Sequence, residues 1–77
     1  MTLKYSRQRQ AVWDFIQTRS DHPTASIVYE EVRRMYPNIS LGTVYRNLML
    51  LRDMGKIGTV DIGDNAVHFD PNISLHE

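Results

Sequence analysis

The 77-residue sequence predicts a winged helix-turn-helix domain, a mainly α fold in which three helices precede a two-stranded β-hairpin. Three segments carry apolar side chains at three- and four-residue steps, the spacing that places them along one face of a helix. Between residues 57 and 70, two short runs of alternating apolar and polar residues flank a Gly-Asp-Asn turn, which is typical of a hairpin. A single domain over residues 1–70 accommodates all of these elements.

Composition and charge narrow the class of protein. Hydrophobic residues make up 42% of the chain, which is enough for one small core. The 77 residues include no cysteine, so they form neither disulfides nor thiolate metal sites. No apolar run approaches a membrane span or a secretion signal, so we expect a cytoplasmic protein without membrane contact. Residues 1–56 hold nine cations and five acids (+4), whereas residues 57–77 hold four acids and no cation (−4). A basic body of this kind fits contact with nucleic acid.

The first helix is predicted to begin after Ser6, which can act as its N-cap, and to end near Arg19. Its apolar face consists of Ala11, Val12, Phe15 and Ile16. The cations Lys4, Arg7 and Arg9 cluster at its start, where the positive end of the helix dipole disfavours them. Contact with phosphates would offset that cost.

The second helix is predicted to begin after Thr24, its N-cap, and to end before Pro37. In the preceding loop, Pro23 favours an extended backbone at His22. The side chains expected to face inward are Ala25, Val28, Val32 and Met35. Because only a short turn separates this helix from the next, the pair predicts a helix-turn-helix.

The third helix, predicted over residues 41–54 with Ser40 as its N-cap, carries the surface that indicates function. Its apolar stripe consists of Leu41, Val44, Leu48 and Leu51. The outward arc carries Gly42, Tyr45, Arg46 and Met49, where a solvated helix would carry Lys, Glu or Gln. A small residue followed by side chains that reach base edges suits the DNA major groove. A buried bundle helix with Tyr45 and Arg46 at its rim is the alternative interpretation.

The hairpin follows Gly55, which stands where a glycine commonly ends a helix. The side chains expected to pack onto the helices are Val60, Ile62, Val67 and Phe69. The same alternation directs His68 to solvent, and we assign it no role. The wing tip, Gly63-Asp64-Asn65, has no cation, which argues against strong phosphate contact.

Five segments, in this order and spacing, resemble the DNA-binding half of the ferric uptake regulator family. They are Ser6-Arg7-Gln8-Arg9, His22-Pro23-Thr24-Ala25, Pro37-Asn38-Ile39-Ser40, Thr43-Val44-Tyr45-Arg46-Asn47-Leu48 and Leu51-Arg52-Asp53-Met54-Gly55. The resemblance covers residues 4–76, and Asp70, where other branches carry Glu, indicates the peroxide-responsive branch. It implies the operator-reading domain of a metal-dependent transcriptional repressor of metal uptake or peroxide-stress genes, which binds A/T-rich palindromic DNA as a homodimer.

The resemblance also implies how DNA is contacted. The third helix would enter the major groove, where Tyr45 and Arg46 meet base edges and thymine methyls. Lys4, ahead of the first helix, would enter the adjacent minor groove, because narrow A/T grooves attract cations. The residues expected to contact DNA are Lys4, Arg7, Arg9, Ser40, Gly42, Thr43, Tyr45, Arg46 and Met49.

By position, the resemblance implies three ligands of a regulatory iron, manganese or zinc ion, namely His22, Asp70 and His76. Nitrogen and carboxylate ligands suit these metals. The remaining ligands and the dimerisation region would follow Glu77, so residues 71–77 are expected to begin a hinge. This chain alone would then be monomeric and bind no metal tightly. Without the resemblance, His22 could be a solvated loop histidine and Asp70 part of a strand end.

Other classes of function fit the sequence less well. An enzyme is disfavoured because the chain has no cysteine, no phosphate-binding glycine loop and no carboxylates paired for acid–base catalysis. The alternative is a winged helix that binds protein through Tyr45, Met49 and Leu50. Arg46 and the basic cluster favour DNA, whose binding weakens steeply with salt.

Overall fold

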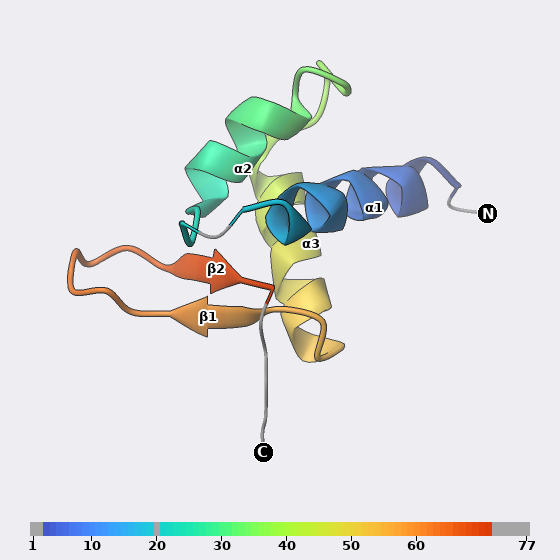
Figure 1. Cartoon of the computed structure of the whole chain (residues 1–77). Coiled ribbons are helices and arrows are strands. Elements are labelled where there is room, and N and C mark those ends of the chain that lie inside the picture. Colours follow the sequence, from blue (N-terminus) through green and yellow to red (C-terminus); the bar gives the residue numbers. More distant parts are fainter. Residues whose placement is uncertain (1–2, 20, 72–77) are drawn as a thin grey trace.

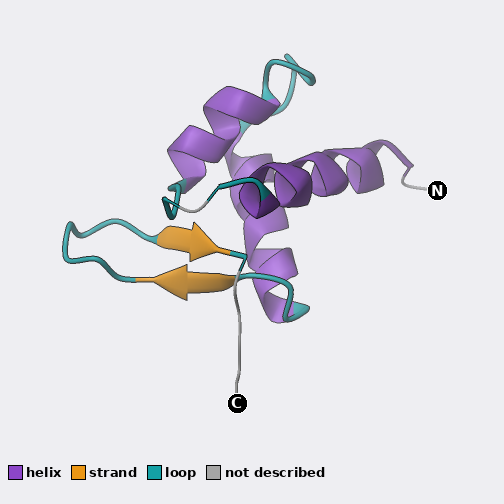
Figure 2. Cartoon of the chain, in the orientation of Figure 1, coloured by secondary structure: helices purple, strands orange, loops and turns teal. Residues whose placement is uncertain are grey.

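The computed structural model of the chain describes residues 3–19 and 21–71. Its elements are α1 (Leu3–Gln17), α2 (Ala25–Val32), α3 (Leu41–Asp53), β1 (Gly58–Val60) and β2 (His68–Asp70). The helices cross one another, and the antiparallel hairpin extends to one side of them (Figures 1 and 2). This architecture confirms the predicted winged helix-turn-helix. Within the described residues, no helix is long and apolar enough to cross a membrane.

The hydrophobic core lies where the three helices cross. Its buried members are Ala11, Val12, Ile16, Val28, Val32, Ile39, Val44, Leu48, Leu51, Ile57 and Phe69. Phe69 of β2 has no exposed surface, and burying a side chain of this size stabilises a fold by about 1.5–3 kcal/mol. Because an isolated two-stranded hairpin is marginal in water, this contact attaches the wing to the helices.

The ends of α2 and α3 follow local signals in the sequence. The Thr24 hydroxyl accepts a hydrogen bond from the Ile27 amide at 3.4 Å, and Ser40 accepts one from Thr43 at 3.0 Å, so both predicted N-caps are confirmed. Gly55 ends α3 with a φ of 78°, a conformation that favours glycine. The amides of the two residues after the C-cap donate back into the last turn, which is the Schellman arrangement.

The predicted helix ends and faces were wrong at several positions. α1 begins at Leu3, so Ser6 is not its N-cap and Lys4 lies within the helix instead of ahead of it. The Lys, Arg and Gln residues there favour helix, which extends it past the capping residue. α2 ends at Val32, and a turn leaves Met35 62% exposed instead of buried. Leu41, in the first turn of α3, is 45% exposed.

The hairpin also differs from its prediction. The strands pair Gly58 with Asp70 and Val60 with His68, so residues 61–67 form a loop that we call the wing loop. Ile62 and Val67 lie in this loop and are about half exposed (54% and 47%), so they do not pack onto the helices. The prediction placed them in the strands because apolar and polar residues go on alternating through the wing loop. Hydrogen bonds from backbone amides to the side chains of Asp61 and Asp64 hold this loop instead of strand pairing.

Substitutions of Gly42, within α3, and of Gly55, just after its end, should change stability in opposite directions. Gly55→Ala should destabilise the fold by about 1–2 kcal/mol, because alanine must adopt a left-handed backbone there. Gly42→Ala should stabilise it by up to about 1 kcal/mol, because the site is helical and open. Urea denaturation of both variants beside the parent chain measures the two shifts. Shifts of the same sign would contradict the assigned backbone conformations.

Candidate nucleic-acid interface and hinge pair

The exposed face of α3 carries the residues that the sequence directed outward. Tyr45 is 44% exposed, and Gly42 and Arg46 are also exposed. Met49 is only half-buried and packs against the edge of the core, so it is less available than predicted. The opposite side of the helix is held by buried Val44, Leu48 and Leu51, together with buried Asn47, which fix the rotation of the helix.

The N-terminal end of α3 is open and pre-arranged. Ser40 caps the helix, and its hydroxyl also donates to the Thr43 hydroxyl at 3.0 Å. A Cβ on Gly42 would have only the Ser40 hydroxyl within 4 Å, at 3.9 Å. A nucleic-acid backbone or base edge can therefore approach this turn closely, and the positive end of the helix dipole favours an anion.

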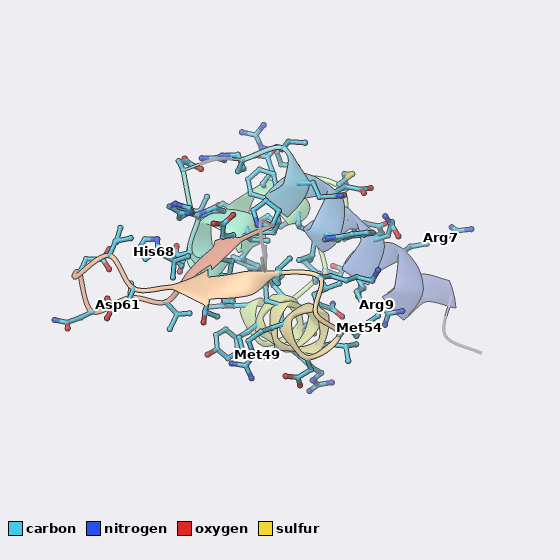
Figure 3. The ribbon with its side chains drawn as sticks, turned by 60° about the horizontal axis from the view of Figure 1, so that its bottom comes forward. Arg7, Arg9, Met49, Met54, Asp61 and His68 are labelled. Carbon is cyan, nitrogen blue, oxygen red and sulfur yellow. The ribbon has the colours of Figure 1, made fainter. Side chains whose placement is uncertain are left out.

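Arg7 and Arg9 of the predicted basic cluster lie on different sides of α1. Arg9 lines a recess with Trp13, Met54 and Lys56, beside the C-terminal end of α3, and Figure 3 shows Arg9 close to that end. Arg7 instead lines a groove between α1 and α2. The side chain of Lys4 lies outside the described part of the chain. The structure thus brings Arg9, and not Arg7, to α3.

Two of the three expected metal ligands, His22 and Asp70, meet at the base of the wing, and we call them the hinge pair. The Nδ1 atom of His22 lies 3.6 Å from Oδ2 of Asp70, although the two residues are distant in sequence. This nitrogen is buried and has no hydrogen-bond partner in the described structure. An unpartnered imidazole nitrogen facing a carboxylate fits a divalent cation of the iron, manganese or zinc type. Within the described ranges, no three His, Cys, Asp or Glu side chains form a metal-binding group. His76 lies outside the described residues.

The backbone of His22 was predicted wrongly. It has a φ of 55°, in the left-handed region, instead of the extended conformation that Pro23 favours. The loop is held by long-range backbone contacts, since the Phe69 amide donates to the Pro23 carbonyl at 3.0 Å and Thr24 pairs with His68. These contacts outweigh the local preference.

His68 is the residue of this region that the sequence analysis missed. It was expected to face solvent, but it is only 7% exposed. Its Nδ1 donates to the His22 carbonyl, and its Nε2 lies 2.8 Å from Oδ2 of Asp64 in the wing loop. The alternation rule failed because the α1–α2 loop lies along the edge of β2 opposite β1, as Figure 1 shows, and the His22 carbonyl of this loop meets the His68 ring. No sequence pattern near His68 indicates its contact with the His22 carbonyl, which lies 46 residues away in the chain.

These two bonds favour a charged imidazole. A carbonyl and a carboxylate both accept, so His68 satisfies them together only when both ring nitrogens carry hydrogen. The bond to the His22 carbonyl, with the bond to Asp64, raises the pKa of His68 above its ordinary value of 6.5. The same bond from His68 lowers the pKa of Asp64 below its ordinary value of 3.8.

The sign of both shifts predicts the pH range in which this contact stabilises the fold. The contribution of His68 is complete below its unfolded-state pKa of about 6.5 and is lost as pH rises through the higher folded pKa. The contribution of Asp64 is lost as pH falls through its lowered folded pKa. NMR titration of the imidazole should therefore give a His68 pKa above 6.5, and Asp64→Asn should lower it more than Asp61→Asn does. A His68 pKa below 6.5 in the parent chain would contradict the bonding arrangement.

Comparison with known proteins identifies the relatives of this chain. The model of the "Ferric uptake regulator family" matches residues 1–77. The peroxide-responsive repressor PerR of Staphylococcus epidermidis is 34% identical over 74 residues, which cover 96% of this chain and 49% of the relative. This chain therefore spans about half the length of that relative.

Solved structures agree in fold. The Campylobacter jejuni peroxide stress regulator superposes with a TM-score of 0.83 at 32% identity, over 96% of this chain and 54% of that one. A zinc-bound manganese uptake regulator superposes with a TM-score of 0.79 at 28% identity, over 90% of this chain and 52% of that one. The described helices and hairpin correspond to one part of these longer proteins.

Proposed function

The chain belongs to the ferric uptake regulator family, and we propose that it is the operator-reading domain of a metal-dependent transcriptional repressor. Members of this family are DNA-binding, metal-responsive regulators and not enzymes. The proposed target is A/T-rich palindromic double-stranded DNA in the cytoplasm, read by a homodimer of the longer protein. The relatives named for peroxide response support control of peroxide-stress genes over metal-uptake genes.

The exposed face of α3 is the observation that carries this proposal. Gly42 lets the first turn approach the floor of the major groove, and Ser40 and Thr43 at the same turn suit phosphate oxygens. Tyr45 offers an aromatic face to a thymine methyl, and the fork of Arg46 fits guanine. Arg9 would contact the backbone beside α3, with Arg7 and Lys4 on the flank.

The regulatory metal would be held by His22, Asp70 and His76, with further ligands from beyond residue 77. Residues 71–77 would then begin a hinge, and the metal would fix the angle between the DNA-binding domain and a dimerisation domain. Zinc in the manganese uptake regulator supports a metal of this class. Because the described residues contribute a single nitrogen–carboxylate pair, this chain alone should bind the metal weakly. It should also be monomeric, since the dimerisation region is expected after Glu77.

A protein-docking winged helix is the second candidate. It is favoured by apolar side chains that are exposed on α3 and at its C-cap, namely Leu50 at 39% and Met54 at 51%. An apolar interface would tolerate salt, whereas a DNA interface releases counterions and weakens steeply with it.

Selection from a random duplex DNA pool at moderate salt tests the proposed function. Retained sequences should be enriched in A/T-rich half-sites, because each half-site matches one α3. Salt-sensitive retention without enrichment would mean that specificity is absent from this chain. If no DNA is retained, the docking interpretation replaces the operator reader.

Substitution of Arg46 tests the role of one side chain. Arg46→Ala should weaken binding to the selected half-site by roughly 1–3 kcal/mol and relax preference at one base position. Arg19→Ala is the matched control, because it removes the same charge from a residue paired with Asp21 beyond the end of α1. Half-site titrations at two salt concentrations compare the variants. An unchanged sequence preference in Arg46→Ala would count against base contact.

A further inference from the structure

His68 has no part in the proposed DNA surface or in the expected set of metal ligands, yet it joins three segments of the fold. It lies on β2, bonds the α1–α2 loop through the His22 carbonyl, and bonds the wing loop through Asp64. A histidine with such low exposure (7%) and both ring nitrogens engaged has no freedom to reorient. Its position therefore depends on both loops at once.

On the wing side of this contact, the Asp64 carboxylate makes two hydrogen bonds. Oδ2 of Asp64 bonds His68, while Oδ1 accepts from the Ala66 amide at 3.1 Å. Both carboxylate oxygens of Asp64 are thus engaged, and the wing loop is tied to β2 through this one side chain. Asp61 lies in the same loop but bonds the Gly63 amide at 2.9 Å, so its hydrogen bond stays within the turn.

The other side of the contact ends at the hinge pair. His22 contributes its carbonyl to His68 and presents its ring Nδ1 to Asp70, 3.6 Å away. Because its backbone is in the left-handed region (φ 55°), few neighbouring conformations are open to it. A cation that draws the imidazole toward Asp70 therefore acts on the same residue whose carbonyl His68 holds.

We propose that His68 is a positioning residue that couples the wing loop to the hinge pair, so that a divalent cation bound at His22 and Asp70 changes the position of the wing. The metal part of this proposal rests on the proposed function. The described residues from Ile57 onward include no Lys or Arg, and the wing loop carries two aspartates. Metal occupancy would therefore adjust how closely these carboxylates approach DNA phosphates, which repel them.

Asp64→Asn in the 77-residue chain tests the coupling while His68 and the hinge pair keep their own side chains. Asp61→Asn is the matched control, because it removes an equal charge from the same loop but not the bond to His68. The first measurement is amide hydrogen exchange in the wing loop without metal. Exchange there should rise roughly tenfold in Asp64→Asn, since a charge-assisted bond is lost, and should rise less in Asp61→Asn.

The second measurement is a Zn²⁺ titration followed by amide chemical shifts at one fixed pH. In the parent chain and in Asp61→Asn, shifts at His22 should be accompanied by shifts across residues 61–67. In Asp64→Asn, the shifts at His22 should remain and those of the wing loop should be lost. If His68 had only a structural role, Asp64→Asn would not remove the zinc-induced shifts of the wing loop while leaving those of His22.

Equal wing-loop responses in Asp64→Asn and Asp61→Asn, in exchange or in zinc-induced shifts, would overturn the coupling. Absence of any zinc response at His22 in the parent chain would overturn the metal part of the proposal, and the exchange comparison would then decide the positioning role. Neither result depends on DNA binding, so failure of the coupling is distinguishable from failure of the operator-reading function.

Discussion

The rotation of α3 about its own axis is the constraint on which the proposed reading surface depends. Val44 and Leu48 are fully buried and Leu51 nearly so, and these side chains leave the helix one orientation against α1 and α2. On a helix, the residues that directly follow a buried position lie well away from it. Tyr45 and Arg46, which follow Val44, are therefore held outward by the core and not by contacts of their own.

Local signals explain how much of the fold could be predicted. The Ser40 cap and Gly55 at the end of α3 act through neighbours within a few residues, so the sequence alone located both ends of that helix. The hairpin could not be predicted equally well, because contacts with other segments bury one residue of β2. Alternation assumes that one face of a strand meets solvent, but the His68 ring bonds the His22 carbonyl of the α1–α2 loop and Asp64 of the wing loop instead.

The candidate site divides in the same way. The outward residues of α3 follow from helix geometry, which is local. The approach of His22 to Asp70 depends on tertiary structure, and only resemblance to a family pointed to it. The left-handed backbone of His22 opposes the local preference of a residue before proline, so no reading of the sequence alone could place it.

The formal net charge constrains the kind of DNA reader that we propose this chain to be. Because its formal net charge is zero, we expect weak long-range attraction to DNA and little non-specific affinity from phosphate contacts. Discrimination must then come from the few side chains that reach base edges on α3. One such helix contacts only a half-site, so high affinity requires that a second copy be held at the matching spacing. A metal that sets domain geometry can control binding strongly for this reason, because the spacing between two weak readers determines their combined affinity.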